Sequence, residues 1–267
     1  MLSFFELVEV KTSQSEKGRK LRETTSDKVL KVLELFGGER VVWTVEEAAE
    51  ELGLPTSTTY RYFRSLAKSE LITTYVPGKY VLGPAVIEYD RQMRLYDPLI
   101  TAAKDEMVRL AEEVGPPTQI LLTRLYHRRV MCVHLVKIGK LPFHVSYERG
   151  KPMPLDRGAA GKVVLAHLGN KMLTEMFSDK PDEELAALRK SLQVIKARGY
   201  SMTEAEIEQG ARGLSVPVFG PDQRLEGSLS VVIELERPSY EEVIKKLIRS
   251  RKLVEANLAI GALALGS

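Results

Sequence analysis

Apolar residues recur at helical spacing in two adjacent segments in the first third of the chain. In the first segment they stand at i, i+3, i+4 and i+7, and Thr44 followed by Glu47 has the spacing of a capping box, so a short helix is predicted to end at Gly53. Pro55 suits the first turn of a second helix, which the same spacing extends to about Ser69. Two helices joined by so short a connection predict a helix-turn-helix.

The second of these helices has one apolar face and one polar face. The polar face carries hydroxyl and arginine side chains, namely Thr56, Ser57, Thr58, Tyr60, Arg61 and Arg64. Hydroxyls at a helix N-terminus bind phosphate oxygens together with free backbone N–H groups, and arginine reaches phosphates or the O6 and N7 acceptors of guanine. We therefore predict that this face binds double-stranded DNA.

A β-hairpin is predicted directly after the second helix. Two alternating segments, Leu71–Tyr75 and Tyr80–Leu82, flank the turn sequence Val76-Pro77-Gly78-Lys79. A hairpin in this place is typical of the wing of a winged helix. Lys79 would then lie at the tip of the wing, beside the DNA backbone.

Two further elements are predicted before the helix-turn-helix. Ser26 or Asp27 is expected to cap a helix that Gly37-Gly38 ends, and a short strand from Val41 to Trp43 can pair with the wing. With them, residues 27–83 are predicted to form one winged helix-turn-helix domain.

The segments on either side of this domain are less regular. Residues 1–26 are mostly polar and charged, so we expect a flexible arm that either stays disordered or lies on DNA or on a partner subunit. Residues 84–96 have a helical pattern and predict a linker helix. The apolar side of that helix either pairs two subunits or packs on its own chain.

The rest of the chain, residues 97–267, mixes helical and strand-like patterns. Asp97 is expected to cap a helix that Gly115-Pro116-Pro117 ends, and Ser239 with Glu242 has the spacing of a capping box before a last helix. Between them the pattern predicts strands at 119–125, 129–136, 141–147, 214–219 and 225–235, and helices at 157–168, 171–177 and 182–198. Strands that follow one another in sequence predict a mainly antiparallel sheet covered by helices, so the fold class is α+β.

Composition is that of an ordinary soluble protein. The 267 residues are 44% hydrophobic, and a formal net charge of +3 does not by itself indicate nucleic acid. The single cysteine, Cys132, excludes an internal disulfide and fits a reducing cytosol. No apolar run approaches the ~18 residues that span a bilayer, and the opening segment lacks the features of a signal peptide. We expect a cytoplasmic protein that does not contact membranes.

The sequence contains no recognisable set of catalytic residues. Its four histidines lack metal-ligand spacing, and Cys132 stands among apolar residues, where an inert buried thiol is expected. The segment Gly158–Lys162 matches a phosphate-binding loop only in part, because Asp156 and Val163 stand where that pattern requires glycine and Ser or Thr. We predict no enzyme activity and no cofactor. The alternative is a sensor or enzyme whose winged helix binds another protein.

The chain after residue 26 resembles the IclR-type family of bacterial transcriptional regulators. In the first domain the resemblance rests on Leu54–Thr58 with Tyr60-Arg61, and on Tyr80–Gly83. In the second domain it rests on short motifs in matching order, which are Pro154–Lys162, Arg198–Ser201, Glu206, Gly210, Ser215–Val218 and Gly227–Ser230. The chain departs from the family pattern at Leu155-Asp156, where many members have Leu-His, and at Thr59 and Tyr62, where many have an aliphatic residue.

This resemblance implies a GAF-like effector-binding domain at residues 97–267 and assembly as dimers or as dimers of dimers. It implies a transcriptional regulator, expected to repress a catabolic operon, that binds operator DNA and senses a small organic acid, with aromatic acids among the candidates. Carried over by position, the effector site would comprise Cys132, Leu155, Gly158, Ala159, Met202, Thr203, Gly213, Ser215, Ser228, Ser230 and Val232.

The residues of the second domain independently favour a carboxylate ligand. Such a ligand needs donors in a mostly apolar cavity, and the backbone N–H groups that follow Arg157 and the hydroxyls of Ser228 and Ser230 would supply them. Ser228, Ser230 and Val232 alternate along one strand, so their side chains are expected to share a face. The two serines could instead form ordinary hydrogen bonds within a buried strand.

Overall fold

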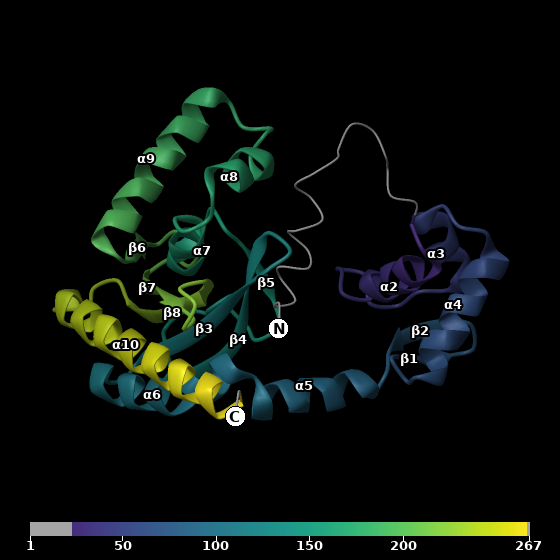
Figure 1. Ribbon diagram of the computed structural model, residues 1–267, viewed down its shortest axis with the longest axis horizontal. Coiled ribbons are helices and arrows are strands. Elements are labelled where there is room, and N and C mark those ends of the chain that lie inside the picture. The colour runs from purple at the N-terminus through teal and green to yellow at the C-terminus, as the bar shows by residue number, and fades with distance from the viewer. Residues whose placement is uncertain (1–22, 266–267) are drawn as a thin grey trace. The chain divides into compact units, whose positions relative to one another are not determined.

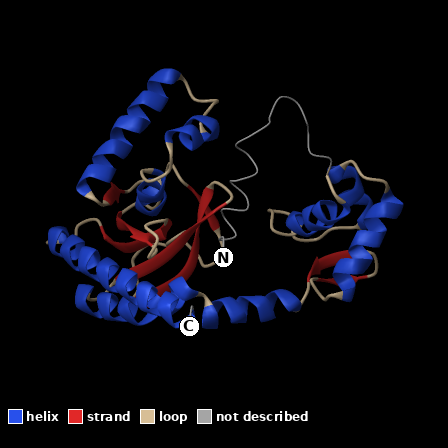
Figure 2. Cartoon of the chain, viewed as in Figure 1, coloured by secondary structure: helices blue, strands red, loops and turns tan. Residues whose placement is uncertain are grey.

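The computed structural model describes residues 23–265, which form two compact units divided between Arg91 and Gln92. Figure 1 labels the elements of both units, and Figure 2 distinguishes their helices from their strands. The predicted arm, residues 1–26, lies outside the described residues except for its last four positions. No described helix is long and apolar enough to cross a membrane.

The first unit has the predicted helix-turn-helix and wing. Its elements are α2 (Thr25–Leu35), α3 (Val45–Leu52), α4 (Thr56–Lys68), β1 (Ile72–Val76) and β2 (Lys79–Leu82). The Thr44 hydroxyl accepts from the Glu47 N–H, and the Glu47 carboxylate accepts from the Thr44 N–H, so the predicted capping box is confirmed. Gly53 ends α3 in the left-handed conformation, with φ of 62°, which also confirms the predicted turn.

The start of α2 differs from the prediction. Its cap is Thr24, rather than Ser26 or Asp27, because the Thr24 hydroxyl accepts from the Asp27 N–H while the Asp27 carboxylate accepts from the Thr24 N–H. An aspartate can therefore complete a capping box in the place where glutamate is usual.

The core of the first unit is aromatic. The Phe63 ring lies 6.0 Å from the ring of Phe36 and 5.0 Å from that of Tyr80. The nine residues of the core cluster are Phe36, which follows α2, Trp43, and residues of α2, α3, α4 and β1. The strand predicted at Val41–Trp43 is reduced to one bridge, in which Trp43 and Tyr80 exchange two backbone hydrogen bonds of 3.0 and 2.8 Å. That bridge still fixes the wing against the rest of the unit.

Helix α5 (Ala85–Tyr96) has the predicted bounds, and it crosses the division between the two units. It is followed at once by α6 (Pro98–Val114), which Asp97 caps with Pro98 in the first turn, as predicted. The predicted boundaries at residues 83 and 96 bracket the division between Arg91 and Gln92.

The second unit is built on a six-stranded sheet in which every neighbouring pair of strands is antiparallel. The strand order is β5-β4-β3-β8-β7-β6. The strands are β3 (Thr118–Tyr126), β4 (Arg129–Ile138), β5 (Pro152–Pro154), β6 (Ser201–Glu204), β7 (Ala211–Phe219) and β8 (Leu225–Glu234). The predicted α+β class with an antiparallel sheet is confirmed.

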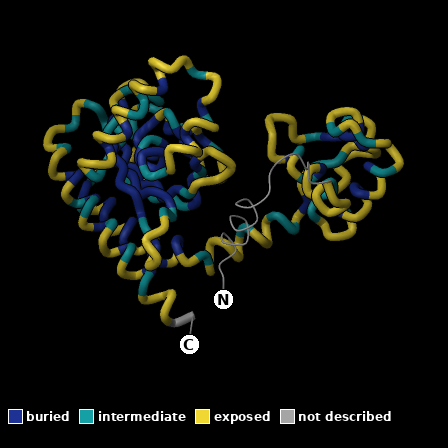
Figure 3. The backbone as a smooth tube through the Cα atoms, turned by 45° about the horizontal axis from the view of Figure 1, so that its top comes forward, coloured by how far each residue is buried: buried dark blue, intermediate teal, exposed yellow. Residues whose placement is uncertain are grey.

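Helices cover both faces of this sheet, in which β3, β7 and β8 are largely buried, and Figure 3 shows the buried interior of this unit in dark blue. Helices α6 and α10 (Tyr240–Leu265) lie on one face, and α7 (Gly158–Leu165) lies on the other beside α9 (Asp182–Arg198), with α8 (Asn170–Met176) between these two in the chain (Figure 1). Alternation along β8 sends Leu229, Val231 and Ile233 to the α6–α10 face. Ser228, Ser230 and Val232 therefore face α7.

Three predictions for the second unit were wrong. Leu141–Tyr147 is not a strand, although Val145 and Tyr147 are buried as the alternation suggested, and the short β5 pairs with β4 instead. Strand β6 was missed because it has only four residues. Ser239 does not form a capping box, since its φ of 62° is not the extended backbone that a capping residue adopts.

Candidate functional site

The predicted DNA-binding residues of α4 lie on its exposed face. Tyr62, Phe63 and Leu66 are buried in the core, and Thr59 is fully buried with its hydroxyl donating to the Pro55 carbonyl at 3.2 Å. Residues Thr56, Ser57, Tyr60, Arg61 and Arg64 are exposed, and Thr58 is half-buried. The core thus fixes the orientation of α4, while its polar residues remain accessible.

The start of α4 has no side-chain cap. Pro55 occupies the capping position and has no side-chain group that can accept a hydrogen bond. The N–H groups of Thr58 and Thr59 already bond to the Pro55 carbonyl, which leaves those of Thr56 and Ser57 at an exposed helix start. Free N–H groups and the positive end of the helix dipole favour an anion such as phosphate there.

The cations predicted to meet DNA lie in two places. Arg61 and Arg64 are exposed on α4, and neither forms an ion pair with any residue in the described part of the chain. Lys79 is exposed on the wing, where it lines a shallow cleft with Arg40, Val41 and Val42. The wing therefore presents a second basic position, separate from the α4 residues.

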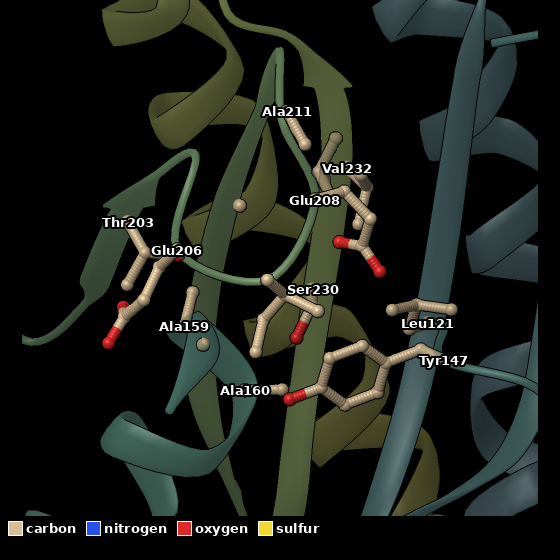
Figure 4. Close-up of a pocket in the computed structure, with 14 residues that line it drawn as sticks. Leu121, Tyr147, Ala159, Ala160, Thr203, Glu206, Glu208, Ala211, Ser230 and Val232 are labelled. Carbon is tan, nitrogen blue, oxygen red and sulfur yellow. The ribbon is translucent and has the colours of Figure 1, made fainter. Parts of the chain in front are cut away.

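A pocket in the second unit lies between the sheet and the start of α7 (Figure 4). It is lined by six of the residues predicted for the effector site, namely Gly158, Ala159, Thr203, Gly213, Ser230 and Val232. Strand pairing brings three of them into one row across the sheet, because Gly213 pairs with both Thr203 and Val232. Its volume is about 30 Å³, enough for one or two water molecules, so a larger ligand would need the walls of the pocket to move apart.

The other five predicted effector residues do not line this pocket. Met202 points to the α6–α10 face because it precedes Thr203 on β6, and Cys132 and Leu155 are buried in the core on the α7 side. The Ser215 hydroxyl is fully buried against that of Ser230 at 2.7 Å, and the Ser228 hydroxyl bonds to that of Thr123, also at 2.7 Å. Ser228 and Ser230, the latter through Ser215, thus make the buried hydrogen bonds that were the alternative interpretation for these two serines, although Ser230 also lines the pocket.

The pocket also contains residues that were not predicted for the effector site, among them Leu121, Tyr147, Ala160, Glu206, Ile207 and Glu208. Tyr147 ends an alternating segment that leads back over the sheet, and Glu206 to Glu208 belong to the connection between β6 and β7. Ala160 and Glu206 lie within motifs that carry the family resemblance, and alternation indicated that Tyr147 is buried, although its segment was interpreted as a strand.

The carboxylates of the β6–β7 connection are held by contacts across the pocket rim. Glu206 Oε1 accepts from Lys162 Nζ at 2.6 Å, and the Arg157 guanidinium donates to the Glu206 carbonyl at 3.1 Å. Glu208 Oε1 accepts from the Ser146 backbone N–H at 2.6 Å. These contacts attach the connection to α7 at Arg157 and Lys162 and to the backbone at Ser146.

Tyr147 is the most unusual polar group in the pocket. Its side chain is 5% exposed, yet its hydroxyl has no hydrogen-bond partner among the described residues. Burial, and then the nearby carboxylate of Glu208, raise the pKa of the Tyr147 hydroxyl, while the Gly161 N–H opposes this weakly without reaching hydrogen-bond geometry. Tyr147 is therefore a neutral O–H donor at physiological pH.

Cys132 has the properties of a structural thiol. It is fully buried, its Sγ donates to the His134 carbonyl at 3.3 Å, and burial raises its pKa to about 11. A thiol with so high a pKa is a weak nucleophile. Within residues 23–265, no cluster of three or more His, Cys, Asp or Glu side chains is arranged to hold a metal ion.

Comparison with known proteins identifies two regions of the chain. The sequence model described as "Bacterial transcriptional regulator IclR C-terminal" matches residues 96–256, and that described as "IclR helix-turn-helix domain" matches residues 25–74. These matches cover both units and most of the chain.

Individual relatives agree with these matches. HTH-type transcriptional regulator XynR of Escherichia coli (strain K12) is 26% identical over 219 residues, covering 77% of this chain and 84% of XynR. Transcriptional repressor IclR of the same strain is 24% identical over 257 residues, covering 88% and 89% of the two chains. An IclR homolog from Microbacterium hydrocarbonoxydans, solved in complex with 4-hydroxybenzoate, has a similar fold with a TM-score of 0.71, at 23% identity and covering 88% of this chain and 99% of that one.

Proposed function

The chain belongs to the IclR family of bacterial transcriptional regulators, and on that premise we propose that it represses a catabolic operon and senses a small organic acid. The family consists of DNA-binding regulators with an effector domain and not of enzymes. Beyond family membership, we propose repression as the mode of regulation, an organic acid as the effector, a homodimer or dimer of dimers as the assembly, and specific residues for each role.

The proposal that the protein binds operator DNA rests on the accessible face of α4. Arg61 and Arg64 would contact bases or phosphates, and the hydroxyls of Thr56, Ser57 and Thr58 would bind phosphate with the free N–H groups of the first turn. The ring of Tyr60 would orient α4, and Lys79 would reach the backbone from the wing. In a homodimer, or in each half of a dimer of dimers, two such helices would enter successive major grooves about 34 to 36 Å apart.

The proposal of an acidic effector rests on the pocket at the start of α7. Much of its lining is apolar, and the uncapped first turn of α7 and the nearby Tyr147 hydroxyl would supply hydrogen-bond donors. A repressor and a 4-hydroxybenzoate complex among the similar proteins favour repression and an aromatic acid. We take aromatic and aliphatic carboxylic acids as the classes to test.

Two sets of hydrogen bonds, joined through the backbone of β3, lie between α7 and the start of α6 and support a route for the effector signal. The Ser228 hydroxyl lies 3.5 Å from the Ala160 carbonyl and 2.7 Å from the Thr123 hydroxyl. Next to Thr123 on β3, the Arg124 guanidinium donates to Asp97 Oδ1 at 3.2 Å. Asp97 caps α6 immediately after α5, so a shift of α7 would change the anchoring of the linker helix.

This route makes a separate prediction. Arg124→Met should leave effector binding within about twofold of wild type, while it reduces the effect of the acid on operator affinity from the ~1 to 3 kcal/mol typical of allosteric coupling. Operator titrations with and without the acid measure this effect. Full coupling in the variant would exclude Arg124 from the route.

The proposal as a whole is tested by a thermal-shift screen of the full chain against aromatic and aliphatic carboxylic acids, followed by operator binding with each hit. A ligand that binds only the folded state raises the apparent melting temperature. We expect at least one acid to stabilise the protein and to weaken its binding to DNA from its own upstream region. Tighter binding with the acid would contradict repression. An operator affinity without salt dependence would indicate that the winged helix-turn-helix domain binds protein instead.

A further inference from the structure

We propose that the pocket at the start of α7 selects a carboxylic acid that also carries a hydroxyl group away from its carboxylate. Tyr147 and the first turn of α7 would receive the carboxylate, and Glu208 would accept a hydrogen bond from the hydroxyl. This inference rests on the proposed function, because it names the class of acid that the effector site takes.

The carboxylate end is indicated by two independent features. No side chain caps α7, so its first N–H groups and the positive end of its dipole face the pocket. The Tyr147 hydroxyl lies at the same place, since a Cβ added at Gly158 would be 3.0 Å from it, and this buried hydroxyl lacks a partner. An unpaired buried donor costs free energy, which an anionic acceptor would recover.

The hydroxyl end is indicated by the charges of the pocket. No Lys, Arg or His is among the described residues that line it, whereas two carboxylates are. Glu206 is already neutralised by Lys162 at 2.6 Å. Glu208 has no ion pair within the described residues, and its carboxylate points into the space between Ser230 and Leu121 (Figure 4). Its Oε1 already accepts from the Ser146 N–H, but a carboxylate without a cation partner still repels a second anion and accepts strongly from a hydroxyl.

These two ends together determine the preference. A carboxylic acid without a hydroxyl would place its apolar part against Glu208 and strip that carboxylate of water without replacing the lost hydrogen bond. A hydroxy acid satisfies both ends at once. Glu208 belongs to the connection between β6 and β7, so its carboxylate would meet the bound molecule from that connection.

The test compares matched acids that differ only in a hydroxyl. Calorimetric titration of the full chain would use 4-hydroxybenzoate against benzoate and 4-hydroxybutyrate against butyrate. Wild type should bind the hydroxylated member of at least one pair about tenfold more tightly, which corresponds to one charge-assisted hydrogen bond. In Glu208→Gln, which keeps an acceptor for the Ser146 N–H, that preference should fall to about threefold or less because the charge is gone.

A second variant separates the two ends of the ligand. Tyr147→Phe should weaken both members of a pair by a similar factor, about tenfold, and leave the preference for the hydroxyl intact. Glu183→Gln on α9 and Tyr126→Phe in the β3–β4 hairpin make the same chemical changes at exposed positions and should bind like wild type.

Three results would overturn the inference, and they are distinguishable from one another. Equal affinity within both pairs, or a preference that survives Glu208→Gln, would refute the role of Glu208 while acid sensing stands. Binding that is unchanged in Tyr147→Phe would refute the carboxylate end. Binding of none of the four acids, by a chain whose thermal unfolding is normal, would count against the acid effector itself.

Discussion

Helices α4 and α7 both begin without a capping side chain, but their surroundings differ. At α4 the first turn is exposed, with Arg61 and Arg64 nearby and no described carboxylate paired to them. At α7 the first turn is enclosed by the sheet, by Tyr147 and by the connection that carries Glu208. One helix start suits a long polyanion that approaches from solvent, and the other suits a small molecule that is removed from water.

Helix α9 shows that a missing cap alone does not make a binding site. It too begins without a capping side chain, at Pro181, but its first turn carries Asp182, Glu183 and Glu184. These carboxylates complement the helix dipole from within the chain. The lesson is that free N–H groups supply a preference for anions, and the neighbouring side chains decide whether any external anion is bound and of what size.

The largest effect is expected at the exposed helix start. Arg61→Ala should weaken operator binding by ~1 to 3 kcal/mol, because a guanidinium that contacts a base or a phosphate is lost. Gel-shift titrations at fixed salt would measure this, with sedimentation to verify that assembly is unchanged. Lys252→Ala removes the same charge from an exposed position on α10 and should bind like wild type. Equal affinities for the two variants would remove Arg61 from the interface.

The next effect concerns the enclosed helix start. Gly158 has φ of 75°, and a Cβ there would lie 3.0 Å from the Tyr147 hydroxyl and 3.1 Å from Ile207. Gly158→Ala should therefore lower the free energy of unfolding by ~1 to 2 kcal/mol and weaken binding of any acid. Scanning calorimetry would measure the change in stability.

Gly261→Ala is the matched control for that substitution. Gly261 lies within α10 with open space around it, so an added methyl group meets nothing within 4 Å. The same chemical change should there raise stability by about 0.5 to 1 kcal/mol, because alanine favours the helix. A Gly158→Ala variant as stable as wild type would show that the start of α7 is not tightly packed.

A smaller effect is expected at α4, where one substitution should raise stability and weaken DNA binding. Thr56→Asp places a carboxylate in the first turn, which should stabilise the helix by ~0.3 to 1 kcal/mol through its dipole. The same charge should weaken operator binding by repelling phosphate. Thr56→Asn has the same shape without the charge, and it should keep more of the DNA affinity. Operator binding of Thr56→Asp at the wild-type level would place phosphate elsewhere.

The smallest effect is a pH dependence of stability at helix α3, which has a capping side chain, unlike α4 and α7. The Thr44 N–H, and then the Arg40 guanidinium, hold the pKa of Glu47 below its ordinary value. Because the folded pKa is the lower one, this contribution to stability is present above about pH 4.5 and is lost as the pH falls through the folded value. Urea unfolding followed by the fluorescence of Trp43, the only tryptophan, reports on this unit.

Glu47→Gln should remove this pH dependence and leave the rest of the acid transition. The contribution is small because the carboxylate is exposed to solvent. An identical loss of stability between pH 5 and pH 3 in wild type and variant would mean that Glu47 contributes nothing in solution.

The sequence predicted best the features whose causes lie within a few residues. The capping box at Thr44, the left-handed Gly53 and the Asp97-Pro98 helix start were all confirmed, because side-chain caps, glycine and proline act on the neighbouring backbone whatever the rest of the chain does. Alternation along β8 also gave the correct face for Ser230 and Val232, since successive side chains of a strand point to opposite sides.

Only the tertiary structure decided the edges of the sheet and the closing wall of the pocket. Alternation at Leu141–Tyr147 correctly indicated burial, but whether such a segment pairs depends on which other strand reaches the same edge, and here β5 does. Met202 and Thr203 are neighbours in sequence, yet they lie on opposite faces of the sheet. Tyr147 and Glu208 stand 61 positions apart and meet only because the sheet and α7 bring their loops together, which no local pattern of apolar and polar residues encodes.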